Sequence, residues 1–220
     1  MKKDFSFYEF TGVLLPGSTL LFGVIWLFPE AKDVLLGKDL SLGALGLFVI
    51  AAYLSGHLIQ SLGNGLESTA WWFTGKPTHW ISWKKPPFLS DTQHDALPAM
   101  LKTQLGDRSK NLKELSKRDT NAIRGQLYSK LKKDGRTGRI DIINGNYGMF
   151  RGIAAAALVI ATTTLFVNGS LKPWANTYIA LSVFFLASYR CYRFGVHYAS
   201  ELYWQSLDLY RDTKPSKKTK

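Results

Sequence analysis

The segment from residue 53 to residue 67, YLSGHLIQSLGNGLE, carries polar side chains at helical spacing. They are His57, Gln60, Asn64 and Glu67. They follow one another at intervals of three, four and three residues, which places them on one face of an α-helix. Histidine exchanges protons near neutral pH, a carboxylate carries charge, and amides both donate and accept hydrogen bonds. Such a set suits a water-filled vestibule, an ion path or a ligand pocket, and it equally suits a polar lock between packed helices.

Two other segments carry comparable side chains. In RCYRFGVHYASELYW the candidates are Arg190, Arg193, His197 and Glu201. In INGNYGMFRG they are Asn144, Asn146, Tyr147 and Arg151. Because isolated polar groups are costly at membrane depth, we expect the three segments to face one another or water. Of these side chains, His57 is expected to lie deepest in the membrane, and it is the leading functional candidate. The alternative is that its ring only donates a hydrogen bond to a backbone carbonyl.

Sequence signatures of catalysis are scarce. The histidines, which show no paired metal-ligand spacing, are His57, His79, His94 and His197. The sequence contains no G-x-S-x-G, P-loop or G-x-G-x-x-G motif. A single cysteine, Cys191, excludes an internal disulfide framework. We expect a protein that is not an enzyme and that needs neither a metal nor a cofactor.

The elements that must position these side chains are long uncharged runs. Four runs without Asp, Glu, Lys or Arg occupy residues 10–29, 40–66, 152–171 and 173–189, and they are 20, 27, 20 and 17 residues long. A spanning helix needs about 20 mainly apolar residues. The predicted fold class is an all-α integral membrane protein with two transmembrane helical hairpins, hence four spans, separated by a small, basic, mainly helical cytosolic insert.

The charges predict the orientation of these spans. Residues 63–151 hold 16 Lys or Arg against 8 acids, and the tail from Arg190 holds 7 against 3. The link between the first two runs, PEAKDVLLGKD, has two lysines against three acids. Since positively charged flanks stay in the cytosol, we expect a multi-pass protein of the cell inner membrane with both termini cytosolic.

The chain is therefore expected to divide into four parts. These are an N-terminal transmembrane hairpin (1–72), a cytosolic insert (73–148), a C-terminal transmembrane hairpin (149–199) and a basic cytosolic tail (200–220). Aromatic residues mixed with lysines after the second run are expected at headgroup level; they are Trp71, Trp72, Phe73, Trp80 and Trp83.

Two helices are expected in the insert. Ser90 or Asp91 is a candidate cap for a helix through Leu105, and Asp119 or Thr120 for a second helix to Lys133. The second helix is expected to carry an apolar side made of Ile123, Leu127 and Leu131.

The excess of positive charge bears on partners. The chain carries a formal net charge of +12, which suits contact with the anionic headgroups of the lipid bilayer. Nucleic acid binding by the basic stretch is the disfavoured alternative, since no RNA-binding or phosphate-loop signature accompanies it. A protein partner or a signalling ligand is expected at the insert. Small residues in the spans would let helices of two copies pack closely, so a homo-oligomer is a further alternative.

Four segments resemble those of bacterial multi-helix transmembrane effector proteins of phage-defence systems, of the retron or CBASS type. The segments are GVLLPG, YLSGHLIQSLGNGLE, NYGMFRG and RFGVHYASELYW. The resemblance covers the helices and their cytosolic ends and leaves the insert uncovered. It implies an antiviral effector that permeabilises or depolarises the inner membrane when a partner or signal releases it. The alternatives are a small channel or transporter, or a regulatory subunit of a membrane complex, without a defence role.

Overall fold

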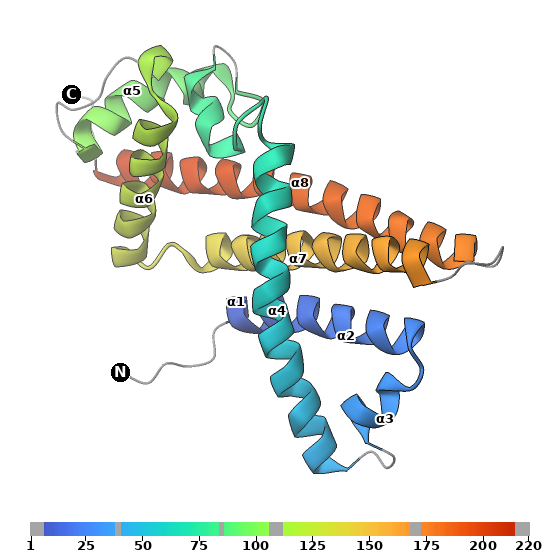
Figure 1. Cartoon of the computed structure of the whole chain (residues 1–220). Coiled ribbons are helices and arrows are strands. Elements are labelled where there is room, and N and C mark those ends of the chain that lie inside the picture. The colour runs from blue at the N-terminus through green and yellow to red at the C-terminus, as the bar shows by residue number, and fades with distance from the viewer. Residues whose placement is uncertain (1–6, 38–40, 84–85, 106–111, 168–172, 214–220) are drawn as a thin grey trace, which may run out of the picture. The chain divides into compact units, whose positions relative to one another are not determined.

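The computed structural model describes residues 7–37, 41–83, 86–105, 112–167 and 173–213, and every regular element within these ranges is helical (Figure 1). The elements are α1 (Phe7–Glu9), the π-helix η1 (Phe10–Leu14), α2 (Leu15–Leu27), α3 (Ala31–Leu36), α4 (Leu42–Ala70), the 3-10 helix η2 (Pro77–Ser82), α5 (Asp91–Leu105), the 3-10 helix η3 (Leu112–Glu114), α6 (Lys117–Lys133), α7 (Gly138–Val167) and α8 (Pro173–Thr213). The all-helical class predicted from the sequence is confirmed.

Three stretches of these helices are long and apolar enough to cross a membrane. Among the described residues they are Phe10–Leu27, Leu42–Ala70 and Gly138–Phe166, and they contain most of the first three uncharged runs. The fourth run begins α8, where Trp174, Asn176 and Tyr178 lower the hydropathy of the first turns. Three candidate spans suggest a multi-pass membrane protein.

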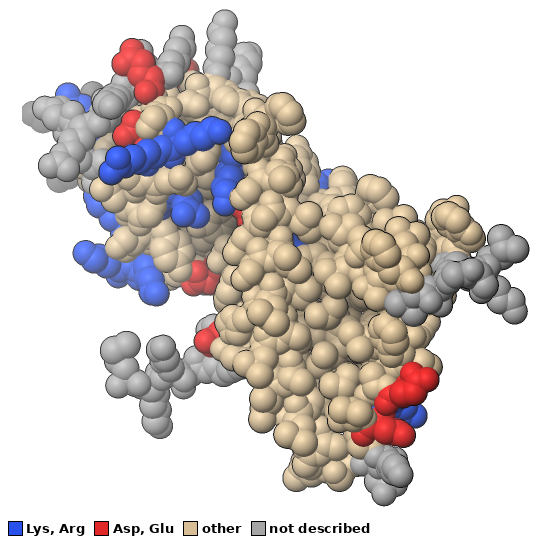
Figure 2. Space-filling view, in the orientation of Figure 1, with Lys and Arg blue, Asp and Glu red and all other residues tan. Residues whose placement is uncertain are grey.

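The chain forms two compact units. Unit 1 comprises Met1–Trp72 and Asn144–Phe194, and unit 2 comprises Phe73–Ile143 and Gly195–Lys220. Unit 1 therefore contains α1 to α4 and the adjoining parts of α7 and α8. Figure 2 shows tan, uncharged side chains over most of the visible face of unit 1, and Lys and Arg gathered on unit 2.

In unit 1, α2 and α4 meet where both helices carry small residues. A Cβ atom at Gly17 would overlap the carbonyl oxygen of Ala52, and one at Gly56 would overlap the carbonyl oxygen of Val13. The two backbones therefore touch, which is how helices associate in lipid without a hydrophobic drive. Figure 1 shows α4 running across the direction of α2. The first two candidate spans thus pack closely against each other, with Gly17 beside Ala52 and Gly56 beside Val13.

In the same unit, α7 and α8 lie side by side (Figure 1). The hydroxyls of Thr164 and Thr177 are 2.7 Å apart, and the rings of Phe150 and Phe194 stack with their centroids 5.5 Å apart. Because late residues of α7 meet early residues of α8, the two helices run antiparallel. The alanines 154–157 of α7 are all buried, so this helix is the interior element of unit 1.

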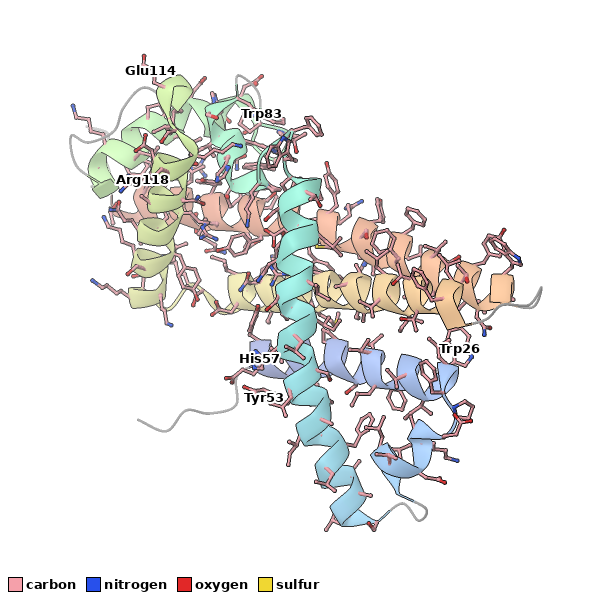
Figure 3. The ribbon with its side chains drawn as sticks, viewed as in Figure 1. Trp26, Tyr53, His57, Trp83, Glu114 and Arg118 are labelled. Atoms are coloured by element: carbon pink, nitrogen blue, oxygen red, sulfur yellow. The ribbon has the colours of Figure 1, made fainter. Side chains whose placement is uncertain are left out.

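The core of unit 2 is aromatic. Phe88 stacks on Tyr203 with 6.0 Å between ring centroids, and Trp80 stacks on Phe88 at 6.5 Å. The Tyr203 hydroxyl donates to the Thr78 carbonyl at 2.8 Å. Trp80, expected at headgroup level, instead belongs to this core and is 3% exposed, whereas Trp83 is 41% exposed (Figure 3).

Caps define the helices of unit 2. Ser90 and Gln93 exchange hydrogen bonds of 3.0 and 3.3 Å at the start of α5, so the helix expected from this position to Leu105 is confirmed. The start of α6 was predicted too late, because Ser116 and Asp119 form a capping box that begins the helix at Lys117. Its predicted end at Lys133 is confirmed, and so is its buried side of Ile123, Leu127 and Leu131.

Candidate functional site

Pro16 leaves a backbone carbonyl of the first candidate span without its usual donor. Proline has no N–H, so the Gly12 carbonyl, four residues earlier, loses its α-helical hydrogen bond. The π-helix η1 occupies this stretch. The side-chain Nε2 of Gln60, on α4, donates to the Gly12 carbonyl and also to the Gly148 carbonyl of α7, the latter at 2.8 Å. A single amide therefore joins three helical segments.

The oxygen of the same amide accepts hydrogen bonds from a guanidinium. Arg151 donates to Gln60 Oε1 from Nη2 at 2.8 Å and from Nε at 3.2 Å. Its Nη1 donates to Glu67 Oε2 at 2.5 Å. The Gln60 amide thus uses both of its N–H groups and both of its lone pairs. We call Gln60, Glu67 and Arg151, with the carbonyls of Gly12 and Gly148, the ion-pair network.

The ion-pair network is closed off from solvent. The side chain of Glu67 is 4% exposed and that of Arg151 is 14% exposed. Burying charges costs several kcal/mol per ion unless each is paired and hydrogen-bonded. Here the guanidinium is bonded on both edges, and its carbon also lies 5.7 Å from the centre of the Tyr147 ring. The site therefore holds charge at a depth where unpaired charge would be expelled.

Glycines make room for this arrangement. A Cβ atom at Gly152 would stand 2.6 Å from Pro16 Cβ and 2.9 Å from Gln60 Nε2, closer than real Cβ contacts. A Cβ atom at Gly63 would stand 3.1 Å from Arg151 Cγ. The chain therefore places its smallest residues where the amide and the guanidinium need space.

Three aromatic residues border the network. The Trp71 indole donates to the Tyr147 hydroxyl at 3.2 Å, and the Trp71 ring stacks on Tyr192 with centroids 5.4 Å apart. Cys191 Sγ lies 3.9 Å from the Tyr147 carbonyl oxygen. Tyr147, which the sequence placed among the polar residues at the start of the third span, thus contributes its ring and its hydroxyl to this border.

The remaining candidates of unit 1 lie outside the network. His57 and Asn64 are exposed on α4, and Asn146 is half-buried on α7. The exposed Arg190 packs against the rings of Phe150 and Phe194, with 5.4 and 5.1 Å to their centroids. The exposed Arg193 donates to the Tyr189 hydroxyl at 3.4 Å.

Two further candidates belong to unit 2. Glu201 is buried, pairs with Arg139 at 3.3 Å and accepts from the Gln205 amide at 3.0 Å. His197 is exposed. Of the twelve candidates named from the sequence, the structure joins Gln60, Glu67 and Arg151 by direct hydrogen bonds.

Unit 2 also contains a histidine with a shifted pKa. Burial lowers the pKa of His79 below its ordinary value of 6.5, and the neighbouring Lys117 and Lys76 lower it further. Its Nε2 faces Asn121 Oδ1 at 3.2 Å, which opposes that shift. Its Nδ1 is buried without a hydrogen-bond partner among the described residues. The fold therefore favours the neutral imidazole.

The chemistry available at the ion-pair network is hydrogen bonding and charge pairing. Over the described part of the chain, no group of three or more His, Cys, Asp or Glu is arranged to hold a metal ion. The carbonyls of Gly12 and Gly148 were not predicted, because the sequence pattern identifies side chains and not backbone groups. Pro16 was the available signal, because a proline inside a span releases one carbonyl that a neighbouring side chain then satisfies.

Comparisons with protein-family models, with curated proteins and with solved structures find no match for this chain.

Proposed function

We propose that this chain is a membrane-embedded effector of an anti-phage defence system. It crosses the cell inner membrane four times, with both termini in the cytosol, and it permeabilises or depolarises that membrane when a partner or signal releases it. The ion-pair network holds the closed form, and its opening is the step that the signal controls. The defence setting rests on the resemblance of the four segments to retron and CBASS effectors.

The observation that carries this proposal is a charged pair buried between candidate spans. Glu67 and Arg151 lie on α4 and α7, both of which contain a candidate span. Ionisable groups within spanning helices mark pathways or switches by default, because they are costly to place there for packing alone. Losing either charge of the pair destabilises the closed form. A signal that separates the pair can therefore shift the population from the closed form to the open form.

Exposed apolar side chains support α8 as the fourth span. The residues that project from its first part are Tyr178, Ile179, Val183, Phe185, Leu186 and Tyr189. They belong to the half of α8 that runs antiparallel to α7. The uncharged run of 17 residues reaches about 26 Å as a helix, and Trp174 and Tyr189 at its ends suit the two interfaces.

Helix lengths bear on how the spans would sit in a bilayer. The 29 residues of α4 extend about 44 Å at about 1.5 Å each, which exceeds a hydrocarbon core of about 30 Å. The 18-residue first candidate span extends about 27 Å. A longer helix fits by tilting or by projecting from the bilayer, and both agree with an α4 that runs across α2.

Unit 2 is proposed to receive the partner or signalling ligand. It carries the exposed basic residues of α6, which are Lys117, Arg118, Lys130, Lys132 and Lys133. Positive surfaces of this kind attract anionic ligands and anionic headgroups.

Membrane-potential imaging of expressing cells tests the proposal. Wild-type protein and Glu67→Gln are compared with the control Asp212→Asn, since Asp212 pairs with Arg136 at an exposed site. All three are compared at equal abundance in the membrane fraction, with and without neighbouring genes and phage infection. We expect the wild type to depolarise cells on infection, Glu67→Gln to depolarise them without it, and Asp212→Asn to behave as wild type. A wild type that reaches the membrane and never changes the potential contradicts the proposal and favours a regulatory subunit.

A further inference from the structure

Helix α4 carries a row of polar side chains that does not belong to the ion-pair network. We call it the outer polar stripe, and its members are His57, Ser61, Asn64 and Ser68, all exposed. By contrast Gln60, Gly63 and Glu67 are buried. A helical wheel places Gln60 and Glu67 on the same broad face as His57 and Asn64, but the structure turns the first pair inward and the second pair outward.

Two members of the stripe, His57 and Asn64, have side chains without hydrogen-bond partners among the described residues, whereas the two serines have partners. Ser61 and Ser68 donate to the carbonyls of His57 and Asn64 in their own helix, at 3.3 and 2.9 Å. The His57 ring packs edge-on against Tyr53 with 4.7 Å between centroids (Figure 3). Among the described residues, however, no hydrogen bond reaches the ring nitrogens of His57 or the side-chain amide of Asn64. Unsatisfied polar groups on a lipid-facing surface are costly.

The stripe continues an exposed apolar seam. Towards the start of α4 the same alternation of three and four residues leads from His57 back to Leu54, Ile50 and Leu47, which are 61, 59 and 67% exposed. Seven positions from residue 47 to residue 68 thus keep the spacing of a helix–helix seam. A seam of this spacing packs against another helix.

We propose that this seam docks a second copy of the chain, α4 against α4. His57 of one copy then hydrogen-bonds to His57 of the other, and Asn64 to Asn64. Every stripe member both donates and accepts, so identical stripes related by a twofold axis satisfy one another. The stripe holds no Asp, Glu, Lys or Arg, so no like charges face each other where the two copies meet. The inference rests on the proposed membrane insertion, and it gives the effector a polar line along the axis between copies.

Disulfide trapping in native membranes tests the seam. In a Cys191→Ala background, Ser61→Cys places a thiol on the stripe, and Leu62→Cys is the matched control, since Leu62 is the next residue, is 53% exposed and points about 100° away around the helix. After copper-phenanthroline oxidation we expect Ser61→Cys to give several-fold more linked dimer than Leu62→Cys. Adding Asn64→Leu to Ser61→Cys is expected to lower the dimer yield several-fold.

Equal linking at both positions, or no linking at either, overturns the seam. If Ser61→Cys is lost from the membrane fraction, Ser68→Cys, at another exposed position of the stripe, takes its place. The outcome is separable from that of the proposed function. Linked Ser61→Cys dimers in cells that never depolarise keep the seam and overturn the effector function, and depolarisation without linking does the reverse.

Discussion

Replacing Glu67 by alanine is expected to destabilise the protein strongly. The change leaves the Arg151 guanidinium without its counter-charge, at a site where its side chain is only 14% exposed. Removing one partner of a buried ion pair costs about 3–5 kcal/mol. In a chain of about this size, each kcal/mol lowers the melting temperature by about 2–4 °C. The expected fall is therefore about 6–20 °C.

The matched control is an ion pair that is exposed to solvent. Asp212 contacts Arg136 at 2.5 Å, but their side chains are 56 and 28% exposed, and exposed pairs contribute about 0–1 kcal/mol. Asp212→Ala is thus expected to lower the melting temperature by a few degrees at most. The double variant Glu67→Met with Arg151→Met removes both buried charges and is expected to recover part of the loss. The remainder is the cost of leaving Gln60 Oε1 without its Arg151 donors.

The assay is the fraction of detergent-solubilised protein that remains monodisperse on size-exclusion chromatography after heating. Two results would refute the reasoning about the ion-pair network. One is a fall for Glu67→Ala no larger than that for Asp212→Ala. The other is a double variant whose loss equals the sum of the losses of Glu67→Met and Arg151→Met made singly, which would mean that the charges do not act as a pair.

Three further predictions concern the packing, the pH response and the topology. Gly17→Ala is expected to abolish folded protein on size-exclusion chromatography because its Cβ would overlap the Ala52 carbonyl, whereas Gly46→Ala, where nothing lies within 4 Å, is expected to be tolerated; equal yields would contradict the close crossing. Because the folded state lowers the pKa of His79, the unfolded state takes up the proton first below about pH 6.5, so the melting temperature should fall from pH 7 to pH 5, and by less in His79→Gln. A reporter fused after Lys220 should be cytosolic and one inserted between residues 29 and 39 external; an external Lys220 would show that the four-span topology is wrong.

Hydropathy and caps allowed most of the helices to be predicted. Three of the four uncharged runs correspond to candidate spans among the described residues, and the 3.6-residue period predicted the buried side of α6 at Ile123, Leu127 and Leu131. The start of α6 was missed because a capping box depends on Ser116 and Asp119 acting together. Trp80 was misplaced because a tryptophan near lysines is typical of a membrane interface, yet its ring stacks in the unit 2 core.

The sequence predicts which polar residues of α4 lie near one another, but it does not predict which of them form the site. Spacing alone groups Gln60 and Glu67 with His57 and Asn64, since all four fall within a third of a helical turn. Which of them face inward depends on where α2 and α7 pack, and that is set by close contacts at Gly17, Gly56 and Gly152. Such contacts join residues far apart in the sequence, so no local pattern reveals them.

Electrical recording from a planar bilayer tests the central claim most directly. The purified chain is reconstituted as wild type and as Glu67→Gln, with insertion verified by protease protection. Because the neutral amide weakens the pair with Arg151, we expect Glu67→Gln to pass ionic current without any signal and the wild type to pass much less. Inserted protein that carries no current in either form would contradict the claim that this chain permeabilises membranes under the control of its ion-pair network.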